Sequence, residues 1–190
     1  MLFRNSAERY ATATVALHWL MLALLAAVYA MIELRELFPK DSDPRNTLKA
    51  LHFMLGLSVL ALVGLRLGLR SASGPAPAIV PTPGPWERRL AAVMHAALYA
   101  LLIAMPLLGW LLLSAKGKPI PFFGLELPPL IAPRDSAVEW LEEVHEIGGT
   151  IGYWLIGLHA AAALFHHYVR HDNTLARMLP RRGGAPQPSR

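Results

Sequence analysis

Long stretches without a charged residue dominate the pattern of this chain. Three of them contain 22, 26 and 23 residues and a fourth contains 16, and they cover Ala11–Ile32, Leu90–Ala115, Ile147–Val169 and Ala50–Leu65, respectively. A helix needs about 20 apolar residues to cross the hydrocarbon core of a bilayer. The short stretch is followed by Arg66 and Arg70, one turn apart, whose stems can reach the interface. The pattern therefore predicts four membrane-spanning helices.

The predicted fold class is all-α, an integral membrane four-helix bundle, because a soluble bundle would show polar stripes along these segments. We expect spans at about 11–35, 48–70, 88–115 and 138–170. Composition agrees, since 54% of the residues are hydrophobic and only 16% are charged, against roughly a quarter charged in soluble domains. We expect a single domain over residues 1–180 and a disordered tail over residues 181–190.

Two connections between the predicted helices are rich in proline. Ser71–Trp86 is predicted to be an extended linker. Lys116–Glu146 is predicted to form an irregular cap, from which the last helix starts with Asp135 or Ser136 as its N-cap.

The basic residues are distributed unequally between the two sides of the predicted membrane protein. Four spans place both termini and the connection between the second and third helices on one side, which holds eleven Lys and Arg against seven on the other. Because basic loops stay inside, we expect both termini in the cytoplasm. The net charge of +5 then reflects topology, and nucleic acid is not expected as a partner.

The absence of cysteine excludes disulfides, iron–sulfur clusters, cysteine-ligated zinc and covalently attached c-type haem. The eight histidines carry the candidate chemistry instead, and most lie within or beside the apolar spans. An ionisable side chain there is costly and indicates function, although a single histidine can also join two helices by a hydrogen bond. These residues are His18, His52, His95, His145, His159, His166, His167 and His171.

Four of the histidines match in predicted depth. His145 and His159 are 14 residues apart on the fourth helix, nearly four turns, and therefore share one face about 21 Å apart. His52 lies near the outer start of the second helix, at the level of His145. His18 lies in the inner part of the first helix, at the level of His159. Pairs His52/His145 and His18/His159 are therefore predicted.

Two facing imidazoles suit bis-histidine ligation of haem iron better than zinc, which takes three or four ligands. Small residues can make room for the haem: Gly56 follows His52 by one turn, and glycines and alanines follow His145 and His159. Gly148 and Gly152 also form a G-x-x-x-G spacing, so close helix packing is the alternative explanation for the glycines.

Several stretches together resemble the bacterial cytochrome b561 family. They are His18-Trp19, Glu33–Pro39, His52 with Gly56, Met105–Gly109, Leu158–His167 (LHAAAALFHH) and Asp172–Pro180 (DNTLARMLP). The resemblance extends over nearly the whole chain and implies a multi-pass protein of the bacterial inner membrane with two haem b groups. It implies the same pairs, with His52 and His145 holding the outer haem and His18 and His159 the inner one.

A quinone site is predicted near His166, which lies two turns beyond His159 on the same face, and the resemblance also implies one there. Lipid or water at the interface is the alternative partner of His166. His95 is expected to support the inner haem. Arg66 and Arg70 can pair with inner-haem propionates or act as positive-inside anchors.

The resemblance implies oxidation of superoxide on the periplasmic side and reduction of ubiquinone in the membrane. Basic residues of the outer side can guide an anion, although a cluster of acids near His145 opposes this. The alternatives are a haem b subunit that passes electrons between quinone and a redox partner, and a transporter with histidine proton relays. The outer basic residues are Lys40, Arg45, Lys49, Lys116, Lys118 and Arg134, and the acids are Asp135, Glu139, Glu142, Glu143 and Glu146.

Overall fold

The computed structural model describes residues 2–180 and consists mainly of four long helices. Each helix is long and apolar enough to cross a membrane, and each overlaps one of the four predicted spans. The predicted all-α class is therefore confirmed, whereas the side of the membrane that each end faces stays a prediction. The helices are α1 (Thr12–Leu34), α2 (Asp43–Ala72), α3 (Pro85–Ala115) and α4 (Asp135–Tyr168).

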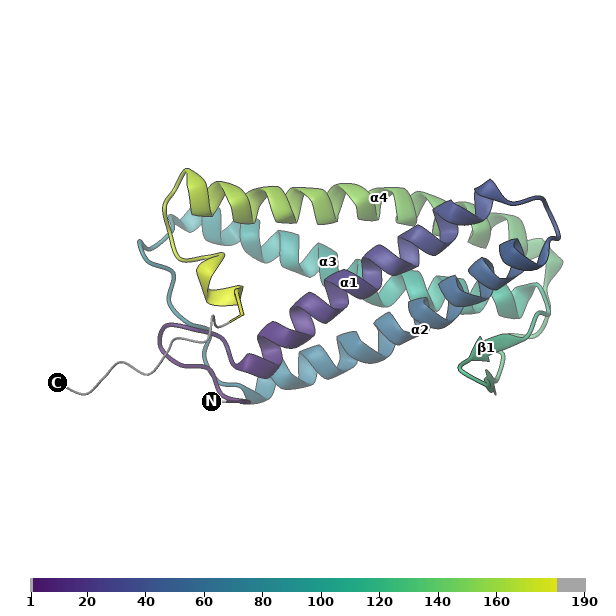
Figure 1. Ribbon diagram of the computed structural model, residues 1–190, viewed down its shortest axis with the longest axis horizontal. Helices are drawn as coiled ribbons and strands as arrows, with labels where there is room; N and C mark the ends of the chain where they lie inside the picture. Colours follow the sequence, from purple (N-terminus) through teal and green to yellow (C-terminus); the bar gives the residue numbers. More distant parts are fainter. Residues whose placement is uncertain (1, 181–190) are drawn as a thin grey trace.

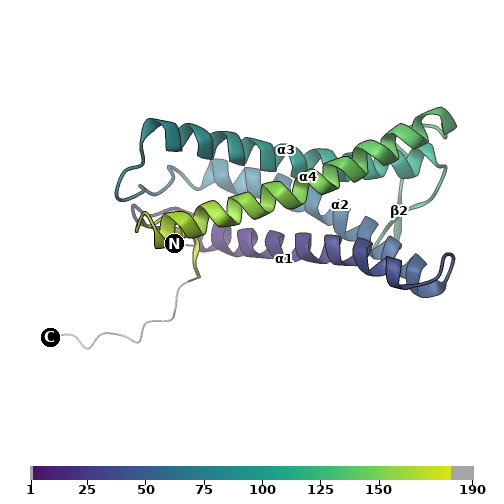
Figure 2. The ribbon, with the colours of Figure 1, turned by 90° about the horizontal axis from the view of Figure 1, so that it is seen from above.

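The helices run up and down along the long axis of the molecule (Figures 1 and 2). Each helix packs against the next one in the sequence, so that α2 lies on α1, α3 on α2, and α4 on α3. The start of α1 and the end of α4 lie at one end of the bundle, here called the terminal end (Figure 1). The opposite end carries a short β-hairpin and is called the hairpin end.

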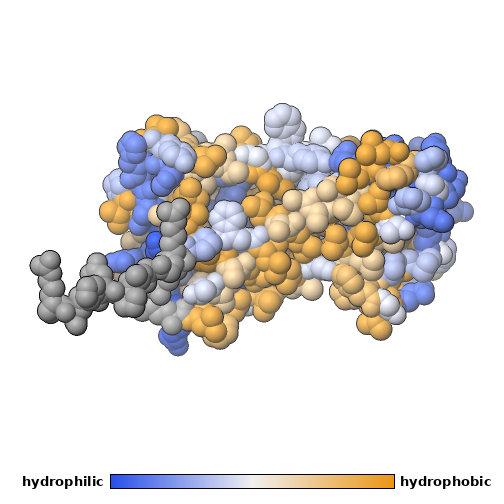
Figure 3. Space-filling view, viewed as in Figure 1, coloured by the Kyte–Doolittle hydropathy of each residue, from blue (hydrophilic) through white to orange (hydrophobic). Residues whose placement is uncertain are grey.

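The outside of the bundle is apolar over its middle part, and polar residues gather at both ends (Figure 3). Large apolar side chains such as Leu90, Val93 and Trp154 are exposed. The buried core is small, with one cluster around Leu17, Met21 and Val63 near the terminal end and another at the hairpin end. Because exposed apolar surface is unfavourable in water, this exterior suits lipid.

The connection between α3 and α4 is more regular than predicted. Strands β1 (Ile120–Phe122) and β2 (Leu125–Leu127) pair in antiparallel fashion. Phe123 and Gly124 both have positive φ at the tip, as a tight two-residue hairpin turn requires. Ile120 is fully buried and packs with Leu57 and Leu113, so the hairpin closes this end of the bundle.

The start of α4 also differs from the prediction. The helix begins at Asp135, but its N-cap residue is Arg134, and no side chain caps the first turn. The predicted capping by Asp135 or Ser136 is therefore wrong. Instead, the Arg134 backbone N–H donates to the Ala115 carbonyl, 2.9 Å away, and so ties the start of α4 to the end of α3.

The proline-rich connection between α2 and α3, predicted to be an extended linker, is held in place by other parts of the chain. The Asn5 side chain donates to the Gly74 and Pro75 carbonyls, both at 3.1 Å. The Asn173 side chain accepts from the Val80 backbone N–H at 2.9 Å. These partners are distant in sequence, which is why the local pattern gave no sign of them. The predicted disordered tail lies outside the described residues.

Candidate functional site

The structure brings four of the predicted site histidines together as two pairs. His52 of α2 faces His145 of α4 near the hairpin end, with ring centroids 6.2 Å apart and an angle of 79° between the ring planes. His18 of α1 faces His159 of α4 nearer the terminal end, at 6.3 Å and 71°. We call them the outer pair and the inner pair. Helix α4 contributes one ring to each pair.

The spacing within each pair is suited to one metal ion between two imidazoles. Metal–imidazole bonds of about 2.0 Å, with about 1.1 Å from a ring nitrogen to the ring centre, place two such centres roughly 6.2 Å apart. No cluster of three or more His, Asp or Glu able to hold a metal occurs within residues 2–180. Two nitrogen ligands on opposite sides fit the axial positions of haem iron better than a zinc site.

The outer pair is positioned by backbone on one side and by a glycine on the other. His52 Nδ1 lies 2.9 Å from the Val28 carbonyl, so Nδ1–H donates to that oxygen and Nε2 is left as the metal-binding nitrogen. The His145 ring packs against Gly109, where an added Cβ would lie 3.2 Å from His145 Cε1. The Nδ1 atom of His145 is buried without a hydrogen-bond partner in the described chain.

The inner pair has a partly buried cation beside it. Arg66 donates from Nε to the Tyr99 hydroxyl at 3.3 Å, while its Nη1 is buried and has no partner among residues 2–180. A buried guanidinium nitrogen without an acceptor is costly, and a haem propionate would supply the missing anion. Arg70 is exposed and makes no side-chain hydrogen bond in the described part of the chain, so the two predicted arginines differ.

His95 of α3 lies beside the inner pair. Its ring centroid is 5.4 Å from that of His159, closer than two rings that share one metal, and its Nδ1 lies 2.6 Å from the Ala91 carbonyl. The supporting role of His95 stays a prediction. Neither His167 nor His171 makes a ring contact with another histidine within residues 2–180. The His167 ring packs on the Tyr168 ring.

The glycines divide between the two explanations that the sequence left open. A Cβ on Gly148 would overlap the Met105 sulfur, and one on Gly152 would overlap the Tyr29 hydroxyl. These two therefore serve close helix packing. At Gly56 and Gly149 an added Cβ would meet nothing within 4 Å, so space remains next to the outer pair.

His166 has a partner that the sequence did not reveal. Its Nδ1 lies 2.5 Å from Oδ2 of Asp172, whose side chain is only 3% exposed. The Thr174 backbone N–H donates to the other carboxylate oxygen at 2.8 Å. Burial alone would raise the pKa of Asp172, but the hydrogen bonds from His166 and Thr174 outweigh it and lower that pKa. The carboxylate therefore stays charged at neutral pH.

Ion pairs at the hairpin end reduce the free positive charge of the predicted basic patch. Lys116 pairs with Glu142 at 2.8 Å. Arg45 pairs with Glu36 at 3.0 Å, and Arg35 shares the same carboxylate. These pairs lower the attraction that the basic residues alone would exert on an anion.

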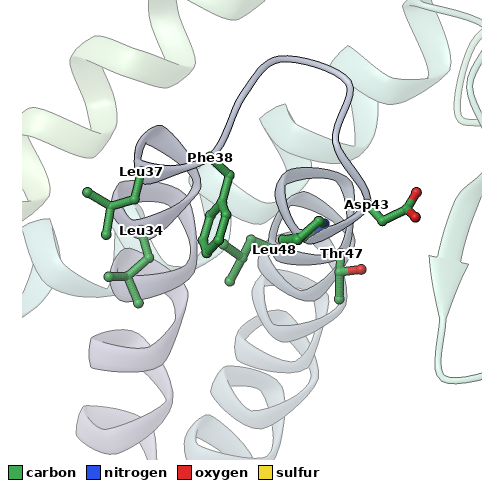
Figure 4. A pocket seen from close by; sticks show the side chains of 7 residues that line it. Leu34, Leu37, Phe38, Asp43, Thr47 and Leu48 are labelled. Carbon is green, nitrogen blue, oxygen red and sulfur yellow. The ribbon is translucent and has the colours of Figure 1, made fainter.

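A pocket of about 590 Å³ opens between the end of α1 and the start of α2 (Figure 4). Leu34, Leu37, Phe38 and Leu48 line most of it, with Asp43 and Thr47 at its edge. No histidine lines this pocket, so it forms part of neither pair.

Comparison with known proteins gives the family. The model of the prokaryotic cytochrome b561 family matches residues 9–181. "Cytochrome b561 homolog 1" of Escherichia coli K12 is 40% identical over 175 residues, which are 92% of this chain and 99% of that protein. "Probable superoxide oxidase CybB" of Yersinia pestis is 37% identical over 177 residues, with 93% and 99% coverage. "Cytochrome b562" of Cereibacter sphaeroides is 28% identical, with 90% and 94% coverage. The chain therefore belongs to the prokaryotic cytochrome b561 family, membrane electron-transfer proteins that carry haem b.

Proposed function

We propose that the protein carries electrons through two haem b groups from superoxide at the hairpin end to ubiquinone at the terminal end. His52 and His145 would be the axial ligands of one haem, and His18 and His159 those of the other. The ring spacings of 6.2 and 6.3 Å carry this proposal. The terminal end would face the cytoplasm, in keeping with its excess of Lys and Arg.

Bound haem supplies one-electron chemistry at each end of the bundle. Because both axial positions would be taken by histidine, substrates exchange electrons without bonding to iron. Two superoxide ions each lose one electron and become dioxygen, and one ubiquinone takes up those two electrons and two protons to become ubiquinol. At the terminal end His166 is the proposed proton donor, because its imidazole can release a proton from a ring nitrogen.

One observation supports superoxide as the electron donor. The Yersinia pestis relative carries the name of a probable superoxide oxidase.

The exposed tip of the β-hairpin favours a second candidate, a haem b subunit that passes electrons between quinone and a redox partner. Phe123 and Leu125 are 61% and 67% exposed, and large exposed apolar side chains at the tip of a hairpin favour contacts with another protein. In this case electrons would enter or leave at the hairpin end by docking rather than by collision with superoxide.

The deciding experiment supplies superoxide enzymatically to the detergent-purified haem protein in the presence of ubiquinone-1. We expect one ubiquinol for every two superoxide ions consumed, beyond the spontaneous reaction measured without protein. The matched control is His52→Ala, which should lack the outer haem and turn over at the spontaneous rate. Equal rates with and without the wild-type protein would contradict superoxide oxidation and favour the partner-dependent candidate.

A further inference from the structure

The segment that follows α4 folds back over the terminal end of the bundle (Figure 1). The Asn173 side chain donates to the Ala78 carbonyl at 3.2 Å, and Arg177 donates to the Pro77 carbonyl. The Met178 carbonyl accepts from Trp19 Nε1 at 2.7 Å. Since Trp19 follows His18 directly, this segment, Asp172–Met178, lies next to the helix that supplies one ring of the inner pair.

The first residue of the segment is a carboxylate that is almost completely buried. Both of its oxygens are used, Oδ2 by His166 at 2.5 Å and Oδ1 by the Thr174 backbone N–H at 2.8 Å. A buried carboxylate is tolerated only where hydrogen bonds and an opposite charge compensate for the lost water. The residue that supplies the opposite charge here is a histidine, which can release its proton.

The contact assigns different tasks to the two ring nitrogens of His166. Nδ1 keeps its proton and donates it to Asp172, because a carboxylate oxygen can only accept. Nε2 is then the nitrogen free to gain or lose a proton, and the carboxylate 2.5 Å from Nδ1 pairs with the ring when the ring is charged. The same division between an orienting carboxylate and a proton-transferring Nε2 operates in hydrolase triads.

We propose that Asp172 is a positioning residue that holds His166 as the proton donor to the quinone. This inference rests on the proposed quinone site at His166. With each electron that reaches the quinone, the Nε2–H bond of His166 breaks and an O–H bond forms at a quinone oxygen. The ring is left neutral, and its Nδ1–H still donates a hydrogen bond to Asp172. Nε2 then takes a new proton from water. Two such cycles supply the two protons of ubiquinol.

His167 and His171 stand next to His166 and Asp172 in the sequence, and two arginines of this region contact other residues. Arg170, which follows the end of α4, pairs with Glu87 of α3 at 3.1 Å. Arg177 lies over the Tyr10 ring, 5.5 Å from its centroid. These groups are unchanged by substitution at position 172, so their titration contributes equally to the wild type and to the variants.

The test measures the quinone half-reaction alone. The holoprotein is reduced anaerobically with stoichiometric dithionite and mixed with ubiquinone-1, and haem reoxidation is followed by stopped-flow spectroscopy between about pH 5.5 and pH 9. In Asp172→Asn we expect reoxidation about 10- to 100-fold slower at neutral pH, the range found for lost outer hydrogen-bond partners. We also expect the rate to fall off at lower pH than in the wild type, because the neutral amide no longer stabilises the imidazolium.

Asn173→Ala is the matched control, since it removes the side-chain hydrogen bonds of Asn173 to Val80 and Ala78 in the proline-rich connection and leaves the His166–Asp172 contact intact. Its rate and pH profile should equal those of the wild type. If Asn173→Ala reproduces the shifted profile of Asp172→Asn, Asp172 acts only by holding the segment, and the inference is wrong.

His166→Ala separates this inference from the proposed function. Slow reoxidation in His166→Ala together with a wild-type pH profile in Asp172→Asn overturns the role of Asp172 and keeps the quinone site. Unchanged reoxidation in His166→Ala overturns the quinone site and the inference with it.

If Asp172→Asn loses haem, Asp172→Glu is used in its place. A pH profile equal to that of the wild type then supports the need for a carboxylate at this position. A pH profile equal to that of His166→Ala contradicts it.

Discussion

The outer and inner histidine pairs have nearly the same ring spacing but very different surroundings. At the outer pair, His52 is fixed by a backbone carbonyl, His145 rests on a glycine, and a hairpin closes the end of the bundle. At the inner pair, the neighbours are ionisable: His95 and the partly buried Arg66 lie beside it, and the His166–Asp172 contact lies further along α4.

This difference indicates a division of labour between two similar ligand sets. Backbone carbonyls and glycine fix geometry without taking up or releasing protons, which suits a centre that handles electrons alone. A partly buried cation and a carboxylate–histidine contact suit the end where electron transfer must be matched by proton transfer. The following predictions test this comparison.

The largest effect is expected from removing one ligand of either pair. His52→Ala and His18→Ala should each lower the haem content from two per chain to about one, since the remaining imidazole alone holds the iron weakly. Haem quantification of the purified variants measures this. His95→Ala should retain both haems; loss of one there, with both retained in His18→Ala, would assign His95 as the ligand instead.

A smaller effect is expected at Arg66, and at the inner centre only. Its partly buried positive charge favours the reduced, less positive iron, so Arg66→Gln should lower one midpoint potential by roughly 60 mV, or about 1.4 kcal/mol for one electron. A spectroscopic redox titration resolves the two centres. Arg70→Gln removes an exposed arginine on the same helix and should leave both potentials unchanged; equal shifts in the two variants would argue for a general charge effect.

The smallest effect is expected at Gly109, beneath the outer pair. In Gly109→Ala the new methyl lies against the His145 ring, and overpacking costs about 1 kcal/mol, which lowers the melting temperature by roughly 2–4 °C. Gly157→Ala is the control, because nothing lies within 4 Å of its added Cβ and alanine favours a helix. Equal stability of the two variants would show that the His145 ring yields without cost.

Much of the architecture followed from local pattern, and so did the pairing of the histidines. The 14-residue spacing between His145 and His159 is a property of one helix. The positions of His52 and His18 along their own apolar spans can be matched to these two levels without knowing how the helices pack. Asp172 could not be recognised in the same way. It stands in a polar stretch after the last span, and only the return of the chain over α4 buries its carboxylate and brings it to His166.

The sequence by itself determined the four apolar helices, the family and the depth at which the histidines lie, because hydrophobic length and helical rise are local quantities. The tertiary structure alone decided which glycines pack against side chains and which leave space, and which of two neighbouring arginines is partly buried. It also decided that Asn5 and Asn173, which precede α1 and follow α4, hold the proline-rich connection by hydrogen bonds. Each of these depends on contacts between residues far apart in sequence, whose side chains meet only once the helices have packed.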